Sequence, residues 1–131
     1  MSNTSLQKDQ IHNQFVQFGI QRGAQYLLNQ HQDTKKIIGC SVGGVIAWNA
    51  AIQGLKLDLL VTISSTRLRY QTHRPDCQIF NFFGKDDLYR PDTNWMNEIG
   101  KHSSEVMDGD HFIYKTEDKV KYILKKSNLI L

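Results

Sequence analysis

The chain has 131 residues, 40% of them hydrophobic and 10% aromatic, a composition typical of a soluble globular protein, and we expect residues 1–131 to form one domain. Its formal net charge is +3, and the sequence lacks the clustered excess of basic residues that indicates nucleic-acid binding. The first residues lack the apolar core of a signal peptide and no apolar run could span a bilayer, so we expect a cytoplasmic protein without a membrane partner.

The first predicted element is an amphipathic helix over residues 7–30. Its apolar residues recur at helical spacing among glutamines: Ile11, Phe15, Phe18, Ala24, Leu27 and Leu28. Residues 35–40 form a short apolar segment that predicts a buried strand. Residues 43–53 predict a largely apolar helix that ends before Gly54. A strand, a tight turn and a helix thus follow one another within a few residues.

Two longer apolar runs, residues 57–63 and 77–83, are typical of strands that are buried on both faces of a parallel sheet. A helix over residues 93–99, a short strand over 104–107 and a last helix over 117–126 complete the pattern. Because strands and helices alternate, we expect an α/β protein: a three-layer α/β/α sandwich around a mostly parallel sheet of about four to five strands.

The two cysteines, Cys40 and Cys77, lie inside apolar segments, and no Cys-x-x-Cys pair suggests zinc or redox chemistry. We expect two buried thiols. A disulfide between them stays open at this point, because it depends on the distance between the two Cα atoms. We expect neither a metal nor a cofactor.

The motif Gly39-x-Ser41-x-Gly43, followed by Gly44, lies where the first predicted strand turns into a helix. A serine on such a tight turn projects its hydroxyl above the sheet, and its neighbours must be glycine or small residues to avoid collisions. Ser41 is therefore a candidate nucleophile, and the three glycines are the residues that permit the turn. The alternative is a glycine-rich helix cap without chemistry.

A serine hydroxyl needs a base that removes its proton and an acid that orients the base. The chain offers an acidic pair, Asp86 and Asp87, after the strand at 77–83, and His111 after the strand at 104–107. The serine turn, and the order serine, acid, histidine, resemble the α/β-hydrolase superfamily. The resemblance covers residues 34–126 and corresponds to the C-terminal part of that fold.

The resemblance implies a role for each of these residues. In the family the acid lies three residues after a glycine and four before a proline, which selects Asp87 between Gly84 and Pro91, with Asp86 as the alternative. His111 stands in a Gly-x-His-aromatic loop and would be the general base. The N–H of Val42, at the start of a helix, would stabilise the oxyanion.

The chain departs from the family before the serine turn, where full-length members have several strands and a loop that supplies a second oxyanion donor. Here only a helix precedes the strand at 35–40. The strand at 35–40 is therefore expected at an exposed sheet edge, which predicts a homodimer formed through that edge. Alternatively, Lys35 and Lys36 are charges that prevent such pairing.

The connection over residues 64–76 is too short for a helical cap, so we expect an open cleft. The surroundings of the predicted site contain four arginines: Arg67, Arg69, Arg74 and Arg90. Arginines here are candidate contacts for a carboxylate or phosphate group, and the alternative is that they are solvated surface residues. Asp108, Asp110 and His111 permit a metal-site interpretation, but further ligands at the expected spacing are missing.

We interpret the chain as a serine hydrolase that cleaves a small-molecule carboxylic ester or thioester through a Ser-Asp-His triad and an acyl-enzyme. The alternative is a hydrolase-derived, non-catalytic binding protein with an incomplete oxyanion hole. Anion binding at the turn of residues 39–44 is less favoured, because neither dinucleotide-type nor P-loop spacing is present.

Overall fold

The computed structural model describes residues 3–101 and 103–131, without the side chains of residues 3–9, 11 and 15. Four strands form one sheet in chain order: β1 (Lys36–Cys40), β2 (Leu59–Ile63), β3 (Gln78–Gly84) and β4 (Ser104–Met107). All neighbouring pairs are parallel, with Ile38 opposite Val61 and Val61 opposite Phe80. The predicted α/β class and the parallel sheet are therefore confirmed, with four strands.

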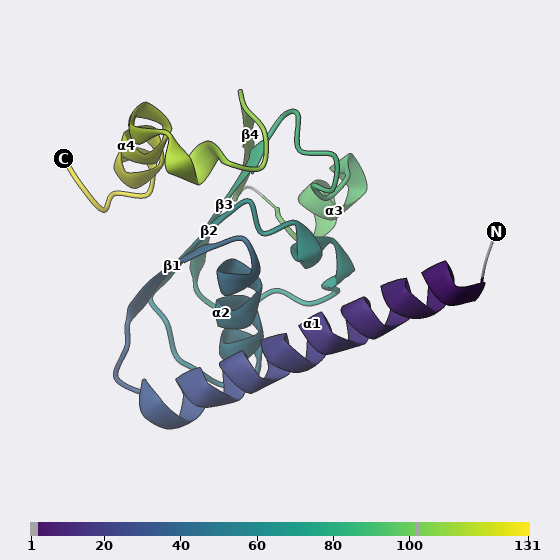
Figure 1. Ribbon diagram of the computed structural model, residues 1–131. Coiled ribbons are helices and arrows are strands. Elements are labelled where there is room, and N and C mark those ends of the chain that lie inside the picture. Colours follow the sequence, from purple (N-terminus) through teal and green to yellow (C-terminus); the bar gives the residue numbers. More distant parts are fainter. Residues whose placement is uncertain (1–2, 102) are drawn as a thin grey trace.

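Helices cover both faces of this sheet. On one face lie α1 (Asn3–Gln30), α2 (Val42–Ile52) and α3 (Thr93–Glu98), and on the other lies α4 (Glu117–Lys126), as Figure 1 shows. Parallel strands require such crossovers, because the chain must return to the same end of the sheet before each new strand. The result is the three-layer sandwich that the sequence predicts.

The hydrophobic core has two parts, one on each face of the sheet. On the α2 side Trp48 is fully buried, and its ring centroid lies 6.0 Å from that of Trp95. On the α4 side Ile123 packs with Ile113 and Phe82. Between them β2 is buried along its whole length. This packing fixes the carboxyl ends of the strands, the edge at which α/β sheets form their sites.

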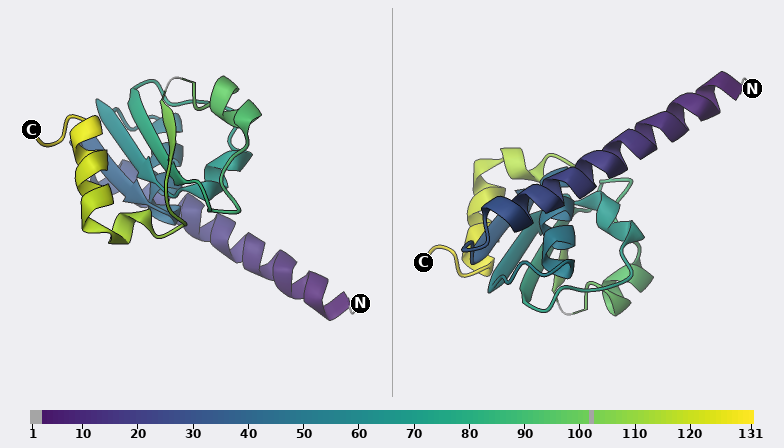
Figure 2. Two further views of the ribbon diagram at one scale, coloured as in Figure 1. Left: turned by 90° about the horizontal axis from the view of Figure 1, so that it is seen from above. Right: turned by 90° about the horizontal axis from the view of Figure 1, so that it is seen from below.

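Helix α1 packs on the body through its carboxyl-terminal half, where Ile20 and Ala24 are buried. Its amino-terminal half extends beyond the rest of the molecule (Figures 1 and 2). Phe18, which the sequence places on the apolar face, is 58% exposed, so that prediction is wrong. The reason is that Phe18 lies about 200° around the helix from Val16 and Ile20, which pack against the core, so its ring faces away from the body. The side chains of Ile11 and Phe15 lie outside those that the structure describes.

Most element boundaries lie close to the predicted ones, although α1 begins at Asn3 rather than near residue 7. Two short 3-10 helices are additional, η1 (Thr66–Tyr70) and η2 (Ile113–Lys115). None of the helices within the described ranges combines the length and the apolar character that crossing a membrane requires.

Strand β1 is at the edge of the sheet, as the sequence predicts. Its outer side is open enough that Ile38 is 46% exposed and Cys40 is exposed. The prediction of a buried thiol at Cys40 is therefore wrong, because the hydrophobic cluster on this face of the sheet includes residues of β2 and β3 but none of β1. Cys77 is partly buried, and both cysteines are free thiols, so they form no disulfide with each other.

Candidate active site

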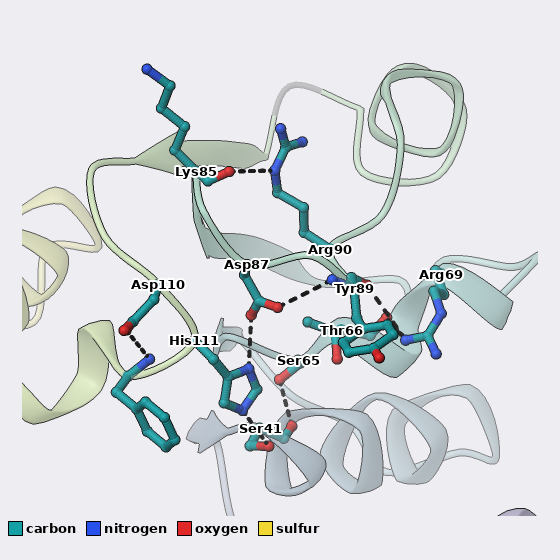
Figure 3. A network of polar contacts seen from close by, with 11 residues as sticks. Ser41, Ser65, Thr66, Arg69, Lys85, Asp87, Tyr89, Arg90, Asp110 and His111 are labelled. Atoms are coloured by element: carbon teal, nitrogen blue, oxygen red, sulfur yellow. Dashed lines mark hydrogen bonds and ion pairs between the residues drawn. The ribbon is translucent and has the colours of Figure 1, made fainter. Parts of the chain in front are cut away.

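Ser41 occupies the turn between β1 and α2 in a conformation that side-chain-bearing residues rarely adopt, with φ 53° and ψ −126°. The turn is anchored on β2, because the N–H of Ser41 donates to the Ile63 carbonyl over 2.7 Å. A backbone held in a strained region by its surroundings is typical of functional sites. The strain directs the serine side chain toward the carboxyl ends of the strands, where His111 lies (Figure 3).

The glycines of this turn are not equivalent. A Cβ at Gly39 would lie 2.5 Å from the Cα of Gly44, and a Cβ at Gly44 would collide with the Ser65 hydroxyl. A Cβ at Gly43 would meet nothing within 4 Å. The expectation that all three positions must be small is therefore wrong for Gly43, because its missing side chain would face open space.

Asp87 is in the loop that follows β3, and it is the acid that the structure brings to the histidine. Its carboxylate is almost completely buried, and Oδ2 lies 2.7 Å from Nδ1 of His111. The side chain of Asp86 is exposed instead, and the backbone N–H of Asp86 donates to the Gly109 carbonyl. The geometry therefore favours Asp87 over the alternative at Asp86.

His111 lies between the acid and the serine. Its Nε2 is 3.2 Å from Oγ of Ser41, and its side chain is 32% exposed (Figure 3). Because an ionised carboxylate only accepts hydrogen bonds, the contact with Asp87 assigns the proton to Nδ1. Nε2 is then left as an acceptor for the Ser41 hydroxyl. The three predicted residues thus form a continuous chain of side-chain contacts.

Ser65 is part of this site, although no motif in the sequence indicates it. It is fully buried just before η1, and its hydroxyl donates to the Ser41 carbonyl over 2.7 Å. This bond fastens the serine turn to the segment after β2. A small polar residue in a short connection carries no pattern that would distinguish it, and the contact joins residues 24 positions apart.

Val42 is the first residue of α2, where an N–H has no acceptor within the helix. A small cavity of about 70 Å³ lies beside it, lined by Ser41, Val42, Val45, Thr66 and Arg67. Its volume suits a few non-hydrogen atoms next to the serine. The expected absence of a strand before the elbow strand holds for the described residues, since β1 follows α1 directly.

The arginines near the site differ in their contacts. Arg67 lines the cavity beside Ser41 and donates to Oδ1 of Asn13 on α1. The guanidinium of Arg69 donates to two carbonyls, and that of Arg90 to the Lys85 carbonyl. Arg67 is thus the arginine best placed to contact an anionic group, and the anion-binding role of Arg67, Arg69 and Arg90 stays a prediction. Arg74 donates instead to the Ile99 and Lys101 carbonyls, near β4.

Cys40, next to Ser41, and Asp110, next to His111, are not part of the Ser41–His111–Asp87 contacts. Although the Cys40 side chain is exposed, its partial desolvation raises the pKa of the thiol, which favours the protonated, less nucleophilic form. Asp110 accepts from the backbone N–H of Phe112. Within residues 3–101 and 103–131, no cluster of three His, Cys, Asp or Glu side chains could hold a metal ion.

Comparison with known proteins supports the fold. No protein-family model matches the sequence, and no curated protein matches it significantly. A crystal structure of a predicted CIB-like hydrolase from Thermoplasma acidophilum is 16% identical, with a TM-score of 0.63 over 84% of this chain and 58% of that one. Alpha/beta hydrolase domain-containing protein 10 from mouse is 15% identical, with a TM-score of 0.53 over 79% of this chain and 65% of that one.

At this identity the likeness establishes the fold alone. The chain has the architecture of α/β-hydrolases, as its sequence motifs indicate. It spans less than two thirds of the length of either of these proteins.

Proposed function

We propose that this chain of α/β-hydrolase fold is a serine hydrolase that cleaves a small-molecule carboxylic ester or thioester. The observation that carries the proposal is the unbroken series Ser41 Oγ to His111 Nε2, 3.2 Å, and His111 Nδ1 to Asp87 Oδ2, 2.7 Å. A base within reach of a hydroxyl, itself oriented by a buried carboxylate, is the arrangement that activates serine. The fold of the two solved hydrolases supports the same class of reaction.

In the proposed mechanism, Nε2 of His111 takes the Ser41 proton as Oγ attacks the substrate carbonyl carbon. Asp87 stabilises the imidazolium and keeps its Nδ1 proton in place. The tetrahedral intermediate collapses when the alcohol or thiol leaves with the proton from His111. Water then attacks the acyl-enzyme by the reverse proton path, which releases the acid and regenerates Ser41.

The developing oxyanion would be stabilised by the N–H of Val42 and by the positive end of the α2 dipole. Only this donor can be assigned in the described part of the chain. A hole that lacks one donor typically loses about a hundredfold to a thousandfold in turnover. We therefore expect a slow hydrolase that reacts with activated esters more readily than with amides.

The test is labelling with a fluorophosphonate, which needs an activated serine and no knowledge of the natural substrate. We expect the wild type to be labelled and to hydrolyse short nitrophenyl esters. Ser41→Ala should lose the label and at least about a thousandfold of the turnover. Ser103→Ala removes a serine hydroxyl that contacts Gly100 and Arg74, and should keep both. Labelling that persists in Ser41→Ala would reject Ser41 as the nucleophile.

A second candidate is a non-catalytic binding protein derived from a hydrolase. The observation that favours it is the position of β1 at the sheet edge, with no preceding strand in the described residues to bring a second oxyanion donor. This candidate predicts that the folded wild type resists the fluorophosphonate and all activated esters. Rapid hydrolysis of a short acyl ester would refute it.

A further inference from the structure

The short helix η1 lies between the serine turn and the acid loop, and it contacts both. At its beginning, the hydroxyl of Ser65 donates to the Ser41 carbonyl. At its other end, Arg69 extends to the loop that carries Asp87 (Figure 3). The helix η1 and the Ser65 that precedes it therefore connect the two parts of the site that must stay at a fixed distance from each other.

The guanidinium of Arg69 is held by several groups at once. Its Nη1 donates to the carbonyl of Thr66 over 3.0 Å and to that of Tyr89 over 3.4 Å, and Nη2 donates to the Tyr70 hydroxyl over 2.9 Å. Its Cζ also lies 4.4 Å from the ring centroid of Tyr70 and 5.6 Å from that of Tyr89. Such contacts combine donor geometry with cation–π attraction, which a lysine reproduces only in part.

The residue that Arg69 holds is in turn bound to the acid. The backbone N–H of Tyr89 donates to Oδ1 of Asp87 over 3.3 Å, while Oδ2 of the same carboxylate accepts from His111. The loop itself has little packing at its tip, because Leu88 is 91% and Tyr89 67% exposed. The contact from Arg69 adds to the hydrogen bonds within the loop, such as that from the N–H of Asp87 to the Gly84 carbonyl.

We propose that Arg69 is a positioning residue: it clamps the Tyr89 backbone so that the Asp87 carboxylate stays aligned with Nδ1 of His111. This inference rests on the proposed serine hydrolase for its effect on rate, but its effect on the Asp87–His111 contact is independent of catalysis. It gives Arg69 a role in the site other than that of contacting a substrate anion.

The matched control is Arg74, on the same connection. Its guanidinium also donates to backbone carbonyls, those of Ile99 and Lys101, but at the far end of the connection, near β4. Arg74→Met therefore removes an arginine of the same charge and the same kind of contact without affecting the acid loop. Melting temperatures of both variants report any general loss of stability.

The first readout is kinetic. We expect Arg69→Met to lower kcat and the rate of fluorophosphonate labelling about tenfold, the effect of one lost charge-assisted hydrogen bond, with KM unchanged. Arg69→Lys should recover part of the loss, and Arg74→Met should match the wild type. In an Asp87→Ala background, Arg69→Met should cause no further loss, because its effect passes through Asp87.

The second readout needs no activity. A proton shared between an imidazole and a carboxylate resonates far downfield of backbone amides, and the Nδ1 proton of His111 should give such a signal, absent in Asp87→Ala. We expect the signal to broaden or vanish in Arg69→Met and to persist in Arg74→Met. If the fluorophosphonate does not label the wild type but the downfield signals of the variants follow this pattern, the proposed function is rejected and the role of Arg69 is retained.

The proposal is overturned if Arg69→Met retains the downfield signal and the labelling rate of the wild type. It is also overturned if Arg69→Met and Asp87→Ala lower the rate additively, or if the wild type lacks the signal. Should Arg69→Met fail to fold, the same comparisons apply to Arg69→Lys, for which a smaller change in the same direction is expected.

Discussion

The two glycines after Val42 differ in what surrounds them. Gly43 is inside α2 with open space where a Cβ would be, whereas Gly44 faces the Ser65 hydroxyl and the Cβ of Thr62. A glycine inside a helix is unfavourable unless close packing requires it. Gly44 therefore allows Ser65 to reach the Ser41 carbonyl, and Gly43 has no such role.

This difference predicts opposite effects of the same substitution. Gly43→Ala should raise the free energy of unfolding by about 0.5–1 kcal/mol, because alanine is the better helix former. Gly44→Ala should lower it by about 1–3 kcal/mol through overpacking, and should also slow fluorophosphonate labelling. Denaturant unfolding of the two variants measures the difference. Equal stabilities would show that the contact with Ser65 does not constrain residue 44.

The sequence predicts the residues whose chemistry is tied to a local pattern. Ser41, Asp87 and His111 are each found by a short motif, and their order in the chain makes the combination specific. The roles of Ser65 and Arg69 could not be predicted in this way. Their partners lie 24 and 20 residues away, and the contacts exist only because η1 is placed between two loops.

At the scale of elements, α1 shows the limit of periodicity. The helical spacing predicts one apolar face along the helix, but it does not show which side of the helix the body covers. Val16 packs against the core, whereas Phe18 is on the outward side of the helix, with Cζ of Arg22 5.6 Å from its ring centroid. Ile20, two residues further on, is buried in the core against α2.

Substitution of Ile20 and of Phe18 by alanine should therefore change the free energy of unfolding by different amounts. Ile20→Ala should lower the free energy of unfolding by about 2–4 kcal/mol, because it leaves a cavity between α1 and α2. Phe18→Ala should change it by no more than about 0.5 kcal/mol, although more atoms are removed. Denaturant unfolding measures both. A large loss for Phe18→Ala would mean that the exposed ring is covered in solution.

The apolar patterns of the sequence predict the longer helices and the strands, and the packing of the fold agrees with these patterns. The 3-10 helix η1 could not be predicted, because its five residues contain a single buried apolar side chain, Leu68, and therefore show no period. It is nevertheless the element that connects the serine turn to the acid loop. The elements hardest to predict from periodicity are thus short ones whose contacts are with loops.

At the scale of the whole molecule, the sequence predicts parallel strands and an exposed elbow strand but does not determine the strand order. The observed order places β1 and β4 at the two edges. At the two ends of β1, the Lys35 carbonyl accepts from the N–H of Leu59 and the N–H of Ser41 donates to the Ile63 carbonyl, so both bond toward β2. Because backbone direction alternates along a strand, Lys36, Ile38 and Cys40 direct their N–H and C=O groups outward.

These outward groups fit a second copy of the same strand. In an antiparallel pair around a two-fold axis at Ile38, Lys36 of one chain lies opposite Cys40 of the other, so the lysines do not face each other. The pairing would bury the exposed Ile38 side chains together and continue the sheet. We therefore expect light scattering at micromolar concentration to report twice the mass of one chain.

Substitutions of Ile38, at the two-fold axis, distinguish backbone pairing between the two β1 edges from association through side chains alone. Ile38→Pro removes an outward N–H that β2 does not use, so the monomer should fold and the dimer should be lost. Ile38→Thr keeps that N–H on a residue that favours strands, and should weaken the dimer without abolishing it. A monomeric wild type would contradict the prediction. Equal dissociation of both variants would show that the two copies associate through side chains, with the backbone edge of β1 left open.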